Sequence, residues 1–251
     1  MSHVTENPDE DATSFPAKLD DLSAELSGHP GRRAHAKWMG LRDTMDLHAR
    51  NLSELIALLH RAETDVETAV ELVQNVHPPT VRNEFNAQLN QRLHNSVASA
   101  LTLIDHLRRV VADYQGSQSS AEFNRRNDAI KLDPRAEFIR RLRNYVTHYS
   151  GVVPYANTVS FGQESFQGAV LLDSKALLGW SGWSPKARTF LADAGDGVDL
   201  GELIRWYRGE TLSLGAWLFA QFDGLHGGEV ESANRLVEDF NRYLTGETSD
   251  L

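Results

Sequence analysis

The residues with the clearest potential for chemistry lie between Arg140 and His148, where the chain reads Arg-Arg-Leu-Arg-Asn-Tyr-Val-Thr-His. Arg143 and Asn144 are adjacent, and His148 follows Arg143 by five residues. A histidine titrates near neutral pH and can act as a general acid or base. An arginine can hold a phosphate group through two parallel hydrogen bonds and stabilise charge that develops on it. The pattern therefore indicates a site for phosphate chemistry.

The motif lies near the end of a helix that we expect to begin at Asp133-Pro134, a capping residue followed by a first-turn proline. Gly151 is expected to end this helix, as glycine often does just beyond a last turn. A separate apolar stripe with spacing i, i+4, i+7 and i+11 accounts for the core-facing side: Phe138, Leu142, Tyr145 and Tyr149. His148 therefore does not have to be a core residue.

Basic residues gather around the motif although the whole chain is acidic, with a formal net charge of −10. Residues 121–148 contain seven basic and four acidic residues, a local net charge of +3. A solvated helix face and a small site for a phosphate-bearing ligand both fit this pattern. The overall charge argues against a protein that coats nucleic acid generally.

Two long helices are predicted before the motif helix, over residues 44–76 and 80–115, and a shorter one over 120–131. Each long helix has an apolar seam that alternates four and three residues apart. The seams are Leu55, Leu59, Ala62, Val66, Ala69, Val73 and Val76 in the first helix, and Leu93, Val97, Ala100, Ile104, Leu107, Val111 and Tyr114 in the second. The short turn His77-Pro78-Pro79 separates them, so they should fold back as an antiparallel hairpin.

The helical pattern breaks after Gly151, and residues 152–173 are predicted to form a β-hairpin inserted in a helical protein. Helices are expected again over 174–180, from the cap Ser184-Pro185 onwards, over 199–223 and over 228–245. The tryptophans of this half fit the core better than a ligand box: Trp180, Trp183, Trp206 and Trp217.

We therefore predict three segments, with a soft boundary near residue 151. Residues 1–16 are rich in acids and are expected to be a disordered tail. Residues 17–150 should form a helical bundle. Residues 151–251, the hairpin and the C-terminal helices, should pack on that bundle as one domain.

Several classes of protein are excluded by the composition. The chain has no cysteine, which rules out disulfides and thiolate metal sites and fits a cytoplasmic protein. Its ten histidines are scattered without HExxH or paired carboxylates, so we expect no metal site. Neither a dinucleotide-binding glycine-rich loop nor a G-x-S-x-G elbow is present. No apolar run reaches the roughly 18 residues that span a bilayer, so no membrane contact is expected.

The arginine, four intervening residues and histidine of Arg143–His148, with the polar Asn144 directly after the arginine, resemble the motif of the HEPN superfamily (higher eukaryotes and prokaryotes nucleotide-binding). In that family the motif also lies late in a helix that follows two long antiparallel helices. The resemblance covers roughly residues 43–150. It implies a mainly α fold, an antiparallel helical bundle of HEPN type, with the β-hairpin near 152–173 as an insertion.

The resemblance also implies a function: a metal-independent endoribonuclease, needing no cofactor, that acts as a homodimer in toxin–antitoxin or antiphage systems. The implied catalytic residues are Arg143 on the scissile phosphate, Asn144, and His148 as general acid or base. Arg140 and Arg141 are the implied RNA-binding residues. The implied partners are RNA, a second copy of the chain, and an antitoxin or nucleotidyltransferase.

Two geometries of the site remain open at this stage. On a regular helix Arg143 and His148 are about 140° apart, whereas Asn144 and Arg141 share the face of His148. The site could be composite, with Arg143 from one chain and His148 from the other. Alternatively, Arg141 could be the partner of His148 within one chain. We prefer Arg143, because Asn144 occupies the polar position beside it.

A second hypothesis assigns no catalysis to the motif. In this interpretation the same helix belongs to a nucleotide-binding or partner-binding helical protein. His148 and Asn144 would then be hydrogen-bonded structural groups.

Overall fold

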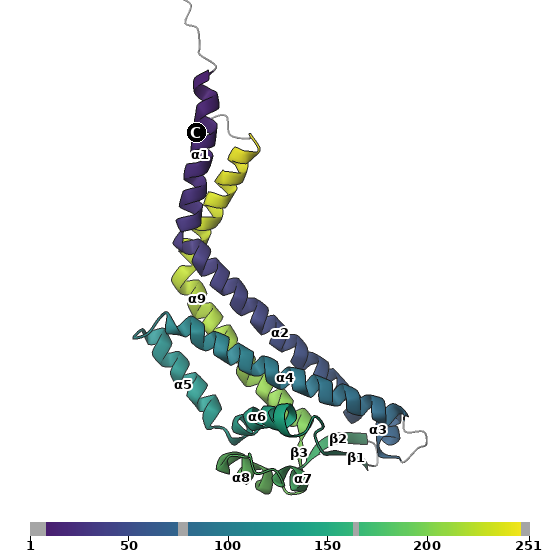
Figure 1. Ribbon diagram of the computed structural model, residues 1–251. Coiled ribbons are helices and arrows are strands. Elements are labelled where there is room, and N and C mark those ends of the chain that lie inside the picture. The colour runs from purple at the N-terminus through teal and green to yellow at the C-terminus, as the bar shows by residue number, and fades with distance from the viewer. Residues whose placement is uncertain (1–8, 75–79, 163–165, 247–251) are drawn as a thin grey trace, which may run out of the picture. The chain divides into compact units, whose positions relative to one another are not determined.

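The computed structural model describes residues 9–74, 80–162 and 166–246 of the chain (Figure 1). It is mainly helical, with one small antiparallel sheet, in agreement with the predicted class. The chain divides into two compact units: residues 41–218, and residues 1–40 together with 219–251. Two long helices, α2 (Pro30–Thr64) and α9 (Leu200–Leu244), contribute to both units.

The smaller unit contains α1 (Asp9–Gly28), the first part of α2 and the last part of α9. A Cβ atom at Gly31 would lie 1.9 Å from the Glu229 carbonyl oxygen, so glycine is needed where α2 meets α9. The rings of Trp38 and Phe219 are 4.9 Å apart between centroids and pack the same pair of segments together. Close backbone approach and aromatic contact thus join the first part of α2 to the later part of α9.

The start of α1 differs from the prediction of a disordered acidic tail over residues 1–16. The helix begins at Asp9, and residues 1–8 lie outside the described part of the chain. Residues 9–16, which were predicted to belong to the tail, are therefore part of a helix.

In the larger unit, α2 and α4 (Thr80–Ala112) run antiparallel, as predicted. Arg92 donates to the Glu54 carbonyl at 2.9 Å, and Ser96 donates to the Asn51 carbonyl at 3.1 Å, so residue numbers rise on one helix as they fall on the other. The predicted turn at residues 77–79 lies outside the described residues.

The first predicted helix is in fact two helices, because the helix is interrupted at Asp65. Its side chain accepts from the Thr68 N–H at 3.3 Å and caps α3 (Val66–Val73). Of the predicted seam, Leu55, Leu59, Ala62 and Ala69 are buried and Val66 and Val73 are exposed, while Val76 lies outside the described residues. The new cap starts a helix with its own axis, so the four-three seam does not continue across it.

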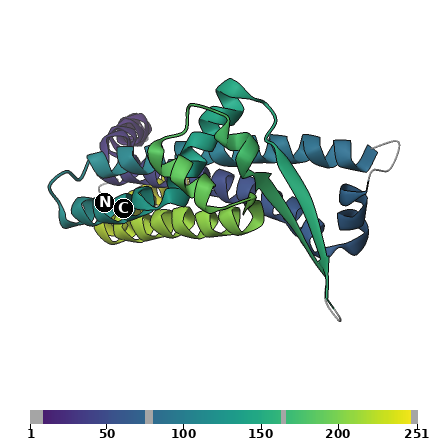
Figure 2. The same cartoon turned by 90° about the horizontal axis from the view of Figure 1, so that it is seen from below.

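The hairpin is present as predicted, with β1 (Tyr155–Phe161) and β2 (Phe166–Asp173) paired antiparallel (Figure 2). A third strand, β3 (Gly197–Asp199), pairs with β2 and was not predicted. The sheet packs on α3 and on the end of α2, and a Cβ atom at Gly168 would lie 2.2 Å from the Ala62 carbonyl oxygen.

After the hairpin come α7 (Ser174–Leu178), α8 (Pro185–Asp193) and α9. Ser184 caps α8 as predicted, accepting from the Ala187 N–H at 3.3 Å. The predicted helices 199–223 and 228–245 form the single helix α9, because its glycines only lower helix stability and do not end it. No helix within the described ranges is long and apolar enough to cross a membrane.

One core joins the residues before and after residue 151, so the division of the chain differs from the predicted boundary there. It contains Leu59 of α2, Leu93 of α4, Leu142 of α6 (Pro134–Asn144), Val170 of β2 and Leu203 of α9. The division into units falls instead at residues 40/41 and 218/219.

A buried polar group connects three helices of this unit. His48 on α2 is fully buried, with Nδ1 3.0 Å from Ser99 Oγ on α4 and Nε2 2.9 Å from Thr211 Oγ1 on α9. The Thr211 hydroxyl also lies 2.9 Å from the Tyr207 carbonyl oxygen, to which it can donate. Burial lowers the pKa of the His48 imidazole from its ordinary 6.5 to about 4.

This pKa shift predicts acid sensitivity. The unfolded chain binds a proton at His48 below pH 6.5 while the folded chain does not until about pH 4, so stability falls as pH falls through this window. We expect the free energy of unfolding, measured with urea, to fall by about 2 kcal/mol between pH 7 and pH 5 because of this residue. His48→Gln should lack that part of the pH dependence, and the exposed control His94→Gln should keep it. Equal pH slopes for His48→Gln and wild type would contradict the prediction.

Candidate active site

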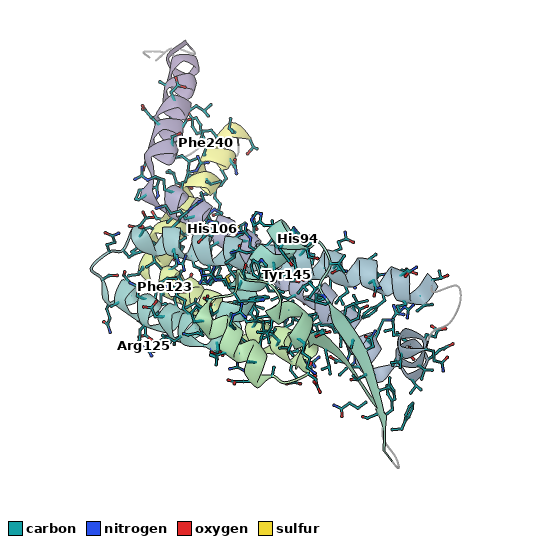
Figure 3. All side chains as sticks on the ribbon, turned by 60° about the horizontal axis from the view of Figure 1, so that its bottom comes forward. His94, His106, Phe123, Arg125, Tyr145 and Phe240 are labelled. Carbon is teal, nitrogen blue, oxygen red and sulfur yellow. The ribbon has the colours of Figure 1, made fainter. Side chains whose placement is uncertain are left out.

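The motif is carried by α6, which begins as the sequence predicts. Asp133 caps the helix by accepting from the Arg135 N–H at 2.8 Å, and Pro134 occupies the first turn. Phe138 and Leu142 are fully buried against the core. Figure 3 labels Tyr145, the next member of the apolar stripe, which is also buried. One face of α6 is thus fixed toward the interior.

The end of the motif is a π-helix, η1 (Tyr145–Tyr149), and not the regular α-helix expected up to Gly151. Its i→i+5 pattern is seen in the bond from the Ser150 N–H to the Tyr145 carbonyl at 2.9 Å. The extra residue in this turn moves Tyr149 off the stripe, and its side chain is 61% exposed instead of buried. Single π turns are uncommon and occur frequently at functional sites.

The π turn also changes the relation between Arg143 and His148. In an α-helix, residues four apart lie on roughly the same side of the helix axis. In a turn closed by an i→i+5 bond, residues five apart do so instead. Part of the Arg143–His148 interval lies in this turn, so the two residues are closer in angle than the 140° of a regular helix.

Glu137 engages two of the arginines that were predicted to bind RNA. Its carboxylate accepts from Arg140 Nε at 2.8 Å and from Arg141 Nε at 3.1 Å, and it is mostly shielded, with 13% of the side chain exposed. Burial raises the pKa of the Glu137 carboxyl, but hydrogen bonds from Ser184, Arg140 and Arg141 outweigh it, and the pKa lies below its ordinary value.

The other bases of the region are paired in the same way, each with an acid close by in sequence. The pairs are Arg125 and Arg126 with Glu122, Lys131 with Asp128, and Arg135 with Asp133. Of the seven bases in residues 121–148, Arg143 alone has neither an ion pair nor a side-chain hydrogen bond to another described residue. Its side chain is half-buried. This distinguishes Arg143 from Arg141, the alternative left open by the spacing.

The remaining predicted catalytic side chains are likewise unengaged. His148 is exposed and Asn144 is half-buried, and neither makes a side-chain hydrogen bond with any part of the chain that the structure describes. Arg143, Asn144 and His148 therefore lie within one and a half turns of the chain with their polar groups available to a ligand. That arrangement can bind a phosphate and exchange a proton with a group beside it.

An aromatic cluster beside the motif was not predicted as part of the site. Tyr149 lies 5.9 Å from Trp180 and 5.2 Å from Tyr145 between ring centroids, and Trp180 lies 4.9 Å from Trp183. The expectation that these tryptophans are core residues holds for Trp183, which is buried, while Trp180 is only partly buried. Their spacing along the chain gave no signal that they meet the motif, because the contact is long-range.

A separate cavity of about 350 Å³ lies between α5 (Gln118–Leu132) and α9. Its walls include Arg126 and Arg135, and the Arg135 guanidinium lies 3.9 Å from the centre of the Trp206 ring. Figure 3 labels Arg125, another lining residue, on α5. The arginines of this cavity are already paired with Glu122 or Asp133, and none of the motif residues lines it.

The chain matches no protein-family model, and no curated protein or solved structure is significantly similar to it. The interpretation of the site therefore depends on the geometry of α6 and η1 and on the resemblance carried by the motif.

Removal of the Glu137 charge tests how firmly Arg140 and Arg141 are held. Glu137→Gln should lower the free energy of unfolding by about 1–2 kcal/mol at pH 7, because two charge-assisted hydrogen bonds to a shielded carboxylate are lost. The pKa of Glu137 is depressed, so this contribution is present above its unfolded pKa of 4.5 and is lost as pH falls through the lower folded pKa. Denaturant unfolding at pH 7 and pH 3.5 measures both effects.

The matched control for this prediction is Asp128→Asn, which removes an exposed ion pair with Lys131 in the neighbouring helix. We expect a change below about 0.5 kcal/mol there. If both variants changed stability equally, the inference that Glu137 holds its arginines more firmly than a surface pair would be wrong.

Proposed function

We propose that the chain is a metal-independent endoribonuclease of HEPN type that acts as a homodimer. The observation that carries the proposal is the contrast within one helix: the neighbouring bases are paired, while Arg143 and His148 have no partner among the described residues. A half-buried arginine without a counter-ion favours an anionic ligand, because an unpaired charge is costly to shield from water. The two antiparallel helices before the motif support the same family.

In the proposed reaction the 2′-oxygen of a ribose attacks the adjacent phosphorus while the bond to the 5′-oxygen of the next nucleotide breaks. His148 either removes the 2′-hydroxyl proton while water protonates the leaving 5′-oxygen, or in its protonated form gives a proton to that oxygen while water accepts the 2′-hydroxyl proton. The Arg143 guanidinium binds the non-bridging oxygens and stabilises the charge that grows on them. The products are a 2′,3′-cyclic phosphate and a 5′-hydroxyl, and no metal enters the step.

The other motif residues have supporting roles in this proposal. Asn144 can hydrogen-bond to the phosphate or ribose beside Arg143. Arg140 and Arg141 are proposed to contact flanking phosphates, in exchange for part of their contact with Glu137. The proposed biological setting is a toxin–antitoxin or antiphage system, with an antitoxin or nucleotidyltransferase as partner.

The nuclease proposal is tested by incubating purified protein with RNA in EDTA. Wild type should cleave and leave 2′,3′-cyclic phosphate ends. His148→Ala should lower the rate about 10²–10⁴-fold, because the proton-transfer group is removed. His94→Ala is the control: His94 is exposed on α4 (Figure 3), and its loss should not change the rate.

No cleavage by wild type, or full cleavage by His148→Ala, would refute the proposal. Binding of RNA without cleavage would favour instead a non-catalytic nucleotide-binding protein.

The dimer part of the proposal has its own test. If Arg143 of one copy works with His148 of the other, a mixed dimer of Arg143→Ala and His148→Ala has one intact site and one doubly altered site. Each variant alone should be inactive, and an equal mixture after subunit exchange should recover about a quarter of the wild-type activity. Continued inactivity of the mixture would indicate that both residues act within one chain.

A further inference from the structure

An exposed aromatic ring directly follows His148. Tyr149 belongs to the same π-helix, and 61% of its side chain is accessible although it is a large ring. On a straight helix it would lie on the buried stripe of Phe138, Leu142 and Tyr145. The π turn therefore presents to solvent a ring that the sequence pattern assigns to the core.

The inner side of this ring is supported by other aromatic rings. The Tyr149 ring is tilted 37° to Trp180 and 48° to Tyr145, with centroids 5.9 Å and 5.2 Å away. Behind them, Tyr145 stacks on Trp183 at 5.9 Å and an interplanar angle of 13°. These contacts hold Tyr149 from one side and leave its outer side accessible.

The segment that carries Trp180 is also held in place. Arg188 of α8 donates to the carbonyls of Leu178 and Trp180, at 3.3 Å and 3.2 Å. Trp183 Nε1 donates to the Leu177 carbonyl at 2.5 Å. The aromatic support of Tyr149 is thus fixed before any ligand binds, which lowers the entropic cost of binding.

We propose that Tyr149, supported by Trp180, is a binding residue that stacks an unpaired nucleobase next to the scissile phosphate. The proposal rests on the proposed function and adds a base-stacking residue to its site. A flat ring with one free side, one residue after His148 and six after an arginine that has no partner among the described residues, suits a nucleotide whose base is splayed out of its own strand. Stacking accepts every base, since each has a π face.

A duplex would not fit this arrangement. Its bases are stacked inside the helix and must be unpaired before one can reach a protein ring. We therefore expect double-stranded RNA of the same sequence to bind more weakly and to be cleaved more slowly than the single strand.

The test separates binding from cleavage. The probe is a fluorescein-labelled single-stranded RNA with 2′-O-methyl groups, which blocks attack by the 2′-oxygen, and its affinity is measured by fluorescence anisotropy. Tyr149→Ala should weaken binding roughly tenfold, the low end for loss of one base stack. Tyr149→Phe should bind as wild type, because the ring is kept. Phe161→Ala, which removes a 68% exposed ring on β1, is the control and should have no effect.

Three results of the binding measurement would overturn the proposal: unchanged binding by Tyr149→Ala, an equal loss in Tyr149→Phe, or equal affinity of wild type for the single strand and the duplex. A thermal unfolding midpoint near the wild-type value is expected for Tyr149→Ala, because the ring is largely exposed; a large drop would place Tyr149 in the core and also overturn it. Cleavage of unmodified RNA distinguishes the two proposals. If wild type and Tyr149→Ala cleave with the same efficiency, the stacking site is refuted and the nuclease proposal stands. If wild type binds RNA without cleaving it and Tyr149→Ala loses that binding, the stacking site stands and the nuclease proposal is refuted.

Discussion

Burial of one face of α6 is the constraint on which the site depends. The helix packs on α4, α5 and α8, and Phe138 and Leu142 are fully enclosed. Burial of each such side chain contributes about 1.5–3 kcal/mol, so the rotation of α6 about its own axis is strongly fixed. The positions between the buried ones, including Arg143 and Asn144, must then lie at the border of the core, where both are half-buried. The hydrophobic pattern thereby determines where the polar motif lies.

The π turn lies where the apolar pattern of α6 ends. Tyr145 and Val146 are both buried, and a regular helix would carry Tyr149 back to the same face. The wider turn keeps the first two inside and releases Thr147, His148 and Tyr149 to the surface. The local geometry therefore exposes a histidine and an aromatic ring together, at a point where α6 is anchored by its core contacts.

The features that depend on residues near one another in the sequence were predicted correctly. The caps Asp133 and Ser184, the strand pair of the hairpin and the antiparallel pairing of α2 with α4 all follow from patterns within a few turns of chain. The unpredicted features depend on distant contacts. β3 is formed by pairing with β2, and the burial of His48 needs Ser99 and Thr211 from two other helices.

The candidate site also combines features that could be predicted from local sequence with features that could not. The spacing of Arg143, Asn144 and His148 was visible in the sequence, whereas the choice between Arg141 and Arg143 was not. In the structure the two arginines differ, because Glu137 binds Arg141 and leaves Arg143 without a partner among the described residues. The exposure of Tyr149 could not be predicted either, because the 3.6-residue period assumes a regular helix and the π turn departs from it.

The pairing of bases with acids has a consequence for how the chain could bind RNA. The local charge of +3 suggested a basic patch, but six of its seven bases already face carboxylates, and the whole chain carries −10. Affinity from counterion release grows with the number of phosphates neutralised, so it would be small here. A ligand at the motif would then be held chiefly by Arg143, whose guanidinium has no partner among the described residues, and by contacts that do not depend on charge. An exposed ring beside the motif can provide such a contact, and for this reason the electrostatics of α6 and the exposure of Tyr149 both fit the proposed ligand, a short unpaired stretch of RNA.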